Sequence, residues 1–425
     1  MEPGRDKKLL GGSDESPQPP FGKGGRFSLC KGGLFSERGE FLSQNAGLYI
    51  HVPFCPRKCG YCDFYSVADT RAIPVYLRAL EAEMDRAAGL PWPGMDTVYL
   101  GGGTPSLLTP RRVGRVLDHA VARLPVAGDA HVTLEANPGT LTRASLAAYR
   151  AEGVRRLNLG VQSLDDSTLA FLGRVHTARQ ARLAVAHARS AGFDEIGLDL
   201  IYGIPGRSLA DWRRDLESAL TLAPEHLSCY ILSLPPETPL GRRAASGFLT
   251  PVPEDEAARL FLFTSAFLEA QGYVHYEVSN FSRGLSHESP HNVKYWNRTP
   301  YLGLGPSAHS FLGNSRWWNV RSVEGYVERL GQGESPEEGR EELTWDQAVT
   351  EWLFLGLRRK MGLDPTEFAR LFGRDFAGLF GALLPALARE GLLKEEEGGF
   401  RPTRRGLLKA DGMARRLAGA LESRT

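Results

Sequence analysis

Three cysteines lie close together near the start of the chain. Cys55, Cys59 and Cys62 follow one another in YIHVPFCPRKCGYCDF (49–64), whereas the other two of the five cysteines lie far away. Three thiolates on one loop are one ligand fewer than a closed zinc site or a fully ligated iron–sulfur cluster needs. Such a site recruits a distant ligand or leaves one metal position open for chemistry. No further CxxC or CxxH pair occurs, which disfavours zinc, although zinc with a remote ligand and a chance cluster stay open as alternatives.

A histidine beside aromatic residues is the second candidate. His291 begins the segment HNVKYW (291–296), and His309 follows in GPSAHSF. Imidazole can ligate haem iron, and the side chains of Tyr295 and Trp296 offer flat apolar surface to a macrocycle. Residue types alone do not separate this role from packing, which is the commoner role of a histidine among aromatic side chains.

The elements that position these residues alternate from residue 47 onward. Buried strands are predicted at 48–54, 96–100, 131–136, 156–161, 195–203 and 226–234, and helices at 74–88, 110–124, 142–152, 177–192, 209–222 and 254–270. Thr109 and Thr177 are predicted to cap helices, and Cys229 is predicted to fill the core. Six strands alternating with helices predict parallel βα units, whose chemistry gathers at the carboxyl ends of the strands. The cysteine loop and GGGTPS (101–106) lie at such ends, as do Glu135, Gln162, Arg174 and Asp199.

The cysteine loop closely resembles the cluster loop of the radical SAM superfamily. The resemblance implies an α/β fold, a partial (β/α)6 TIM-like barrel, in which Cys55, Cys59 and Cys62 hold a [4Fe–4S] cluster. S-adenosylmethionine (SAM) would chelate the fourth iron, and electron transfer from the cluster would yield a 5′-deoxyadenosyl radical. The residues that the resemblance assigns to SAM are Tyr49, Tyr61, Gly102, Gly103, Thr104, Glu135, Gln162, Arg174 and Asp199.

The later part of the chain narrows the resemblance. HNVKYW matches the HNxxYW motif of the HemW-type haem-chaperone branch, which implies that His291 binds haem. The related oxygen-independent coproporphyrinogen III oxidases carry CxxxCxxCxC, but Phe64 occupies the position of that further cysteine here. We therefore predict a haem chaperone that passes haem to acceptor proteins, with a flavodoxin or ferredoxin as electron donor. The oxidase, which decarboxylates coproporphyrinogen III, is the alternative, and whether the chain is an enzyme stays open.

Four segments are expected. Residues 1–46 read as a disordered extension, because they are rich in Gly, Pro, Ser and charge. Residues 47–280 form the barrel, 281–340 a connecting segment with HNVKYW, and 341–425 a helical winged-helix-like domain. In that domain Glu395, Glu396 and Glu397 would repel phosphate near Arg401, Arg404 and Arg405, so no nucleic-acid partner is expected.

Composition and charge agree with an ordinary soluble protein. The chain is 42% hydrophobic and 24% charged, with a formal net charge of +1, so nothing calls for a polyanionic partner. No apolar run is long enough for a transmembrane segment, and the N-terminus lacks the apolar stretch of a signal peptide. Since the cysteines do not form a disulfide framework, a reducing, cytoplasmic location is expected.

Overall fold

A computed structural model describes residues 45–422; the predicted extension 1–46 therefore lies almost wholly outside the described residues. Six parallel strands form the centre of one sheet, in the order of the sequence. All six predicted strands are confirmed, although the last one ends before the predicted Leu234, ahead of Pro235. The strands are β1 (Ala46–Val52), β2 (Met95–Gly102), β3 (Val126–Ala136), β4 (Arg156–Gln162), β5 (Glu195–Tyr202) and β6 (His226–Ile231).

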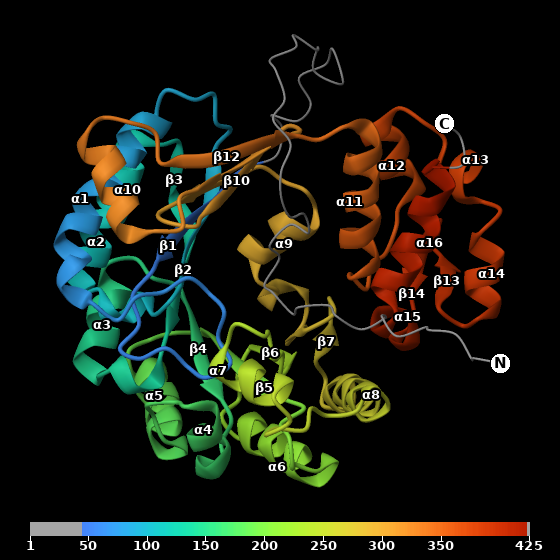
Figure 1. The fold of residues 1–425 in the computed structure, drawn as a ribbon, viewed down its shortest axis with the longest axis horizontal. Coiled ribbons are helices and arrows are strands. Elements are labelled where there is room, and N and C mark those ends of the chain that lie inside the picture. Colours follow the sequence, from blue (N-terminus) through green and yellow to red (C-terminus); the bar gives the residue numbers. More distant parts are fainter. Residues whose placement is uncertain (1–44, 423–425) are drawn as a thin grey trace.

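Helices cover the outer face of this sheet (Figure 1). Their apolar faces and the outward strand residues share one hydrophobic core, to which Cys229 belongs, as predicted. Thr177 caps its helix by accepting from Gln180 N, as predicted. Thr109 occupies the N-cap position of its helix, as predicted, but its side chain makes no capping hydrogen bond. The helices are α1 (Ile73–Ala87), α2 (Pro110–Arg123), α3 (Arg143–Ala151), α4 (Asp166–Leu172), α5 (Ala178–Ser190), α6 (Leu209–Leu220), α7 (Pro239–Ala245) and α8 (Glu254–Ala270).

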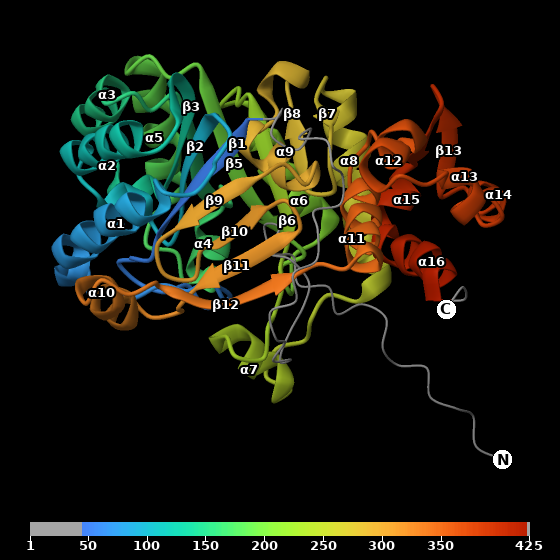
Figure 2. The ribbon, with the colours of Figure 1, turned by 90° about the horizontal axis from the view of Figure 1, so that it is seen from above.

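The expected connecting segment 281–340 is part of the sheet itself. After the hairpin β7 (Val274–His275) and β8 (Asn280–Ser282), it adds four strands beyond β1, so that the sheet order is β12-β11-β10-β9-β1-β2-β3-β4-β5-β6-β8-β7. Figure 2 shows these added strands continuing the sheet. The barrel is therefore open, with β12 and β7 as its two edges. The added elements are α9 (Pro290–Trp296), β9 (Tyr301–Leu304), β10 (His309–Leu312), β11 (Ser315–Asn319), α10 (Val323–Gly331) and β12 (Glu337–Glu342).

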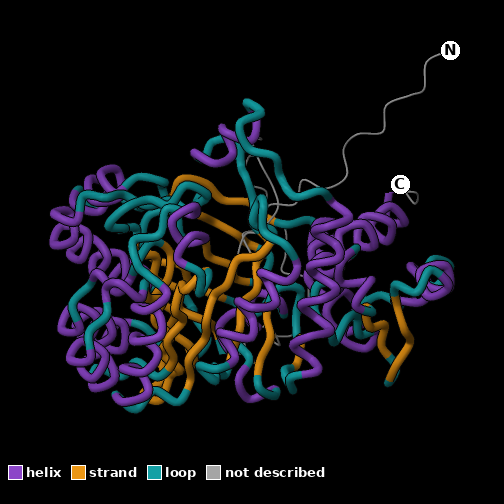
Figure 3. The backbone as a smooth tube through the Cα atoms, turned by 90° about the horizontal axis from the view of Figure 1, so that it is seen from below, coloured by secondary structure: helices purple, strands orange, loops and turns teal. Residues whose placement is uncertain are grey.

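A helical domain with its own core follows the sheet. It contains α11 (Trp345–Leu357), α12 (Pro365–Phe372), α13 (Phe376–Phe380), α14 (Leu384–Arg389), the hairpin β13 (Leu393–Glu396) and β14 (Gly399–Pro402), α15 (Arg404–Leu408) and α16 (Ala410–Glu422). Figure 3 shows this mainly helical part beside the strands of the barrel.

Buried and half-exposed ion pairs join the helical domain to the sheet. Glu351 of α11 is buried and accepts from Arg298 Nε at 2.8 Å and from Arg316 Nη2 at 2.5 Å. Arg404 Nε donates to Glu269 of α8 at 2.8 Å. Arg401 also pairs with carboxylates of its own hairpin. Of Arg401, Arg404 and Arg405, the first two are thus already paired with carboxylates of the chain.

One negative finding concerns membranes. Among residues 45–422, no helix is both long and apolar enough to span a bilayer.

Candidate functional site

A cavity of about 240 Å³ opens at the carboxyl ends of the six parallel strands. Its wall is built from the last residues of β2 to β6, from the segments that follow β1, β2, β3 and β6, and from the segment that follows α4. All three clustered cysteines line it, as do eight of the nine residues that the sequence assigns to SAM. These eight are Tyr61, Gly102, Gly103, Thr104, Glu135, Gln162, Arg174 and Asp199.

The three cysteines are free and partly exposed. Thr104 Oγ1 donates to Cys55 Sγ at 3.5 Å, and Arg174 Nη1 donates to Cys59 Sγ at 3.3 Å. Burial raises the pKa of the Cys62 thiol to about 11. Two of the three sulfurs thus each accept a hydrogen bond from a side chain that lines the cavity. Within residues 45–422, no group of three or more His, Cys, Asp and Glu side chains is placed so that it could hold one metal ion.

Two carboxyl groups face the cavity from neighbouring parts of the sheet. The pKa of Glu135 is raised to about 7. Burial is the main cause and the nearby Asp199 adds to it, while hydrogen bonds from Tyr99 and Gly102 lower the pKa. Burial likewise raises the pKa of Asp199 to about 6, against a hydrogen bond from Ser228 and the charge of Arg174. Two half-buried carboxyl groups beside a cavity form a site that favours a cationic ligand, whose charge would let both groups ionise.

The glycine turn after β2 is required by close backbone packing. Gly102 has φ +107°, and a Cβ there would lie 2.6 Å from the ring of His51. A Cβ on Gly103 would lie 2.7 Å from the carbonyl oxygen of Phe54. The turn is therefore pressed against the end of β1, from which the cysteine loop departs. This contact brings the two loops to the same side of the cavity.

Gln162 and Arg174 also line the cavity. Gln162 has φ +67°, which is uncommon for a residue other than glycine. Arg174 Nη2 donates to Gly160 O at 2.8 Å. The Nε atom of Arg174 is buried without a partner among the described residues. A half-buried guanidinium with an unused donor, next to thiols and carboxyl groups, suits a ligand that itself carries a carboxylate.

Tyr49 and His291 are not brought into this cavity. The Tyr49 hydroxyl is bonded to His51 Nδ1 at 3.0 Å, and its ring lies against Tyr99. His291, on α9, is 1% exposed. Its Nδ1 is bonded to Thr97 Oγ1 and its Nε2 to the Tyr295 hydroxyl, each at 2.9 Å. Both ring nitrogens of His291 are therefore engaged within the protein, and its role as a haem ligand stays a prediction.

Comparison with known proteins identifies the family. The family model for the radical SAM superfamily matches residues 49–219, and the HemN C-terminal domain matches residues 343–408. The heme chaperone HemW of Bacillus subtilis is 35% identical over 363 residues, which cover 85% of this chain and 96% of the relative. The heme chaperone HemW of Mycobacterium tuberculosis is 39% identical over 381 residues, which cover 88% and 95%. The chain belongs to the HemW family.

The HemW fold seen here also resembles a solved radical SAM structure. Coproporphyrinogen III oxidase (HemN) from Escherichia coli aligns with a TM-score of 0.76 at 23% identity, and the alignment covers 91% of this chain and 93% of that chain. Radical SAM membership implies a [4Fe–4S] cluster and SAM. The cavity fits this pair, because it combines three free thiols, two half-buried carboxyl groups and a guanidinium whose Nε has no partner among the described residues.

Sequence reasoning missed several lining residues of this HemW-family site. Asn158, Ile201 and Tyr230 lie on predicted strands and line the cavity, and Asn137 follows β3. The register of the sheet places Asn158 opposite Glu135, so alternation along β4 combined with that pairing could have found it. Phe64, in place of a further cysteine, also lines the cavity.

Proposed function

We propose that this protein is a haem chaperone that binds haem and transfers it to acceptor proteins. The observation that carries the proposal is the sequence identity of 35–39% to HemW heme chaperones, over 85–88% of this chain. Phe64 supports it, because it puts an apolar ring into the cavity wall where the oxidase pattern has a cysteine. The specific acceptors would recognise the protein after haem has bound.

The cavity would hold the cluster and SAM. Cys55, Cys59 and Cys62 would supply one thiolate each, which leaves one iron for SAM. When bound, the cluster would supply the electron that cleaves the sulfonium. Glu135 and Asp199 would bind the cationic part of SAM, and Arg174 its carboxylate. Thr104 would orient Cys55 through the bond that it already donates.

Haem ligation by His291 would require a rearrangement. Its Nε2 would have to exchange the Tyr295 hydroxyl for iron, and α9 would have to withdraw from its seat against β1 and β2. The seat is tight, since a Cβ on Gly47 would lie 2.9 Å from the His291 ring. We therefore propose His291 as a ligand only in a conformation with α9 displaced, and the structure supports a packing role for the state described.

The electron donor would approach the cysteine loop. Arg57 and Lys58 lie between the first two cysteines, are exposed, and form no ion pair among the described residues. A small acidic redox protein such as a flavodoxin or ferredoxin matches this charge and would dock directly over the cluster.

One experiment separates the proposal from its alternative. The resemblance to the HemN structure favours decarboxylation of coproporphyrinogen III. Anaerobically reconstituted protein should be given SAM and a reductant, once with coproporphyrinogen III and once with haem and an apo-acceptor protein. The chaperone proposal expects haem transfer and no protoporphyrinogen. Steady formation of protoporphyrinogen would instead establish the oxidase.

A further inference from the structure

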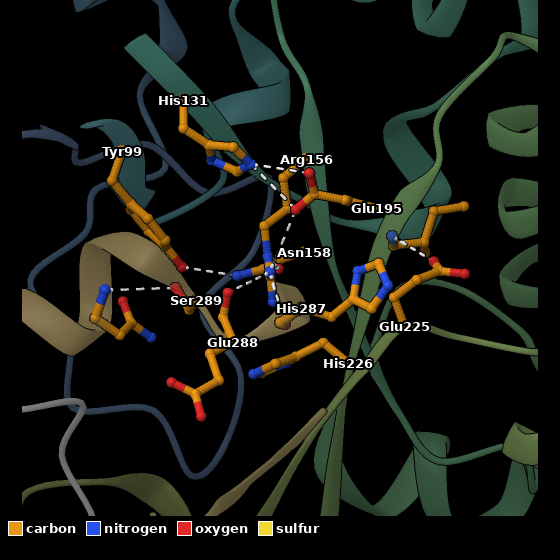
Figure 4. Close-up of polar contacts among 12 residues, drawn as sticks. Tyr99, His131, Arg156, Asn158, Glu195, Glu225, His226, His287, Glu288 and Ser289 are labelled. Atoms are coloured by element: carbon orange, nitrogen blue, oxygen red, sulfur yellow. Dashed lines mark hydrogen bonds and ion pairs between the residues drawn. The ribbon is translucent and has the colours of Figure 1, made fainter. Parts of the chain in front are cut away.

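A chain of hydrogen bonds leads from the cavity into the barrel interior. Tyr99, which does not line the cavity, donates its hydroxyl proton to Glu135 Oε1 at 2.7 Å. Asn158 Nδ2 donates to the Tyr99 hydroxyl oxygen at 3.0 Å. Arg156 Nε donates to Asn158 Oδ1 at 3.2 Å. Figure 4 shows the part of this chain from Tyr99 to Arg156. Four side chains from β2, β3 and β4 are thus connected in sequence.

The guanidinium at the end fixes the direction of every bond in the chain. Arginine carries donors only, so the amide of Asn158 must turn its oxygen toward Arg156 and its NH₂ toward Tyr99. The oxygen of Tyr99 then accepts, and its single proton is left for Glu135. Glu135 is consequently held as an acceptor. Gly102 N donates to its other oxygen, Oε2, at 3.0 Å.

Arg156 is itself held firmly. It is 1% exposed, and its Nη1 donates to the carbonyls of His287 at 3.1 Å and Glu288 at 3.2 Å. Nη1 also lies 3.6 Å from Glu195 Oε2. The two carbonyls stand directly before α9, the helix that carries HNVKYW, as Figure 4 shows beside Ser289.

Close packing leaves Asn158 little freedom. A Cβ on Gly197 of β5 would lie 2.6 Å from Asn158 Oδ1, so the neighbouring strand must have glycine there for the amide to keep this position. The side chain of Asn158, which links Arg156 to Tyr99, is therefore packed against a strand that lacks a side chain at this point.

We propose that Tyr99 and Asn158 are positioning residues for Glu135, and that Arg156 sets the direction of their hydrogen bonds from the entry of α9. This inference rests on the proposed SAM site. Its consequence is that Glu135 accepts two hydrogen bonds in a fixed orientation and turns its remaining lone pairs to a cationic ligand. Displacing the entry of α9 would release Arg156 and alter SAM binding without any contact to SAM.

Other groups face Glu135 and must be kept constant. Asp199 on β5 opposes its ionisation. Tyr49 on β1 and Tyr295 on α9 lie near enough to sense its charge. Tyr99→Phe leaves all three unchanged, so a shift in the titration of Glu135 in that variant would report on the chain itself. Arg156→Met also removes a charge that lowers the pKa of Asp199, so Tyr99→Phe is the deciding variant.

The test is the pH dependence of SAM binding to the cluster-loaded protein, measured at equilibrium between about pH 5.5 and 8.5. Affinity in the wild type should fall as pH drops, because Glu135 takes up a proton. Tyr99→Phe removes one bond to the carboxylate, so the midpoint of this fall should move upward by about one pH unit. Arg156→Met should shift it in the same direction, since Asn158 can then turn and accept the proton of Tyr99.

Tyr273→Phe is the matched control. Its buried hydroxyl donates to Pro224 O at 2.6 Å, away from Glu135, and its profile should equal that of the wild type. A wild-type profile in folded, cluster-loaded Tyr99→Phe would overturn the inference, as would a downward shift. If Arg156→Met does not fold, Tyr99→Phe decides alone. Wild-type protein that binds no SAM at any pH would refute the proposed SAM site itself, a result distinct from an unshifted variant.

Discussion

Asp199 and Glu135 lower the stability of the ligand-free protein, because desolvation opposes the ionisation of both carboxyl groups and the charge of Asp199 adds to this at Glu135. Burying an unpaired charge is unfavourable, and the raised pKa values of both groups express that cost. A cation in the cavity removes it. Asp199 and Glu135 therefore lower the stability of the protein without a ligand and contribute to its stability when a cation is bound.

Asp199→Asn should weaken SAM binding at pH 8 by about 1–3 kcal/mol, the usual cost of losing a charged hydrogen bond. Isothermal titration of cluster-loaded protein would measure it. Equal affinity in the variant, with the cluster intact, would remove Asp199 from the site.

The ligand-free protein gives the control for this prediction. Its folded state has raised carboxyl pKa values, so it binds more protons than the unfolded chain between about pH 4 and 7. Stability should therefore fall as pH rises through that window. In Asp199→Asn this slope should be smaller.

Replacing Cys55, Cys59 and Cys62 together by Ala should abolish cluster binding. Reconstituted wild type should contain about four irons per chain and absorb broadly in the visible range, and the triple variant should do neither. Cys229→Ala is the matched control, because that thiol is 2% exposed and belongs to the core. Full iron in the triple variant, or zinc alone in the wild type, would contradict the cluster.

His291→Ala tests the packing role against the haem role. The variant leaves Thr97 and Tyr295 without their buried partner. Its free energy of unfolding should therefore fall by about 1–3 kcal/mol, and its melting temperature should fall with it. Haem titration followed by the Soret band gives the second measurement. Unchanged haem affinity would assign His291 to packing, and a lost or shifted Soret band would assign it to the iron.

At the residue scale, residue type and position at strand ends predicted most of the residues that line the cavity. The cysteines and the carboxylates were predictable because both loops and strand ends face one side of a parallel sheet. The position of Tyr49 outside the cavity was not predictable, because spacing does not show how far along β1 the cavity reaches. Nor could it show that α9 would carry His291 between Thr97 and Tyr295.

At the element scale, long periodic segments were predictable and short ones were not. Helix α8 begins and ends where the sequence predicts it. Strands β9 and β10 have four residues each, too few for a clear alternation, so the sheet extension went unpredicted. It exists because β9 pairs in parallel with β1, a contact between segments far apart in the sequence.

Glu351→Ala tests how α11 is fastened to this extension. Burial opposes ionisation of Glu351, but Arg298 and Arg316 outweigh it and hold its pKa below the usual range. Removing the carboxylate leaves two buried guanidinium groups facing each other, which should cost about 3–5 kcal/mol. Chemical denaturation would measure the loss.

Hydrogen exchange would locate the effect of Glu351→Ala, with faster exchange expected in α11. Asp411→Ala is a suitable comparison, because its pair with Arg358 is partly exposed and should contribute little. Equal losses in the two variants would contradict the special role of the buried pair.

At the scale of the whole molecule, the sheet, its helices and the helical domain are all built from residues 45–422. A chain that begins at Asn45 should therefore fold, load its cluster and bind SAM like the full protein. Thermal denaturation and iron content would check this. A large fall in melting temperature would show that the first 44 residues pack on the body.

The open sheet ends at β12, whose sequence is EEGREE. An unpaired edge can join the edge of another molecule and begin aggregation. Five of the six residues of β12 are charged, and four of those are glutamates, so two such edges meeting would repel each other. The protein can thus keep an open barrel without becoming a template for its own polymerisation, and neutral β-branched residues at Glu338 and Glu342 should make it precipitate at concentrations where the wild type stays dissolved.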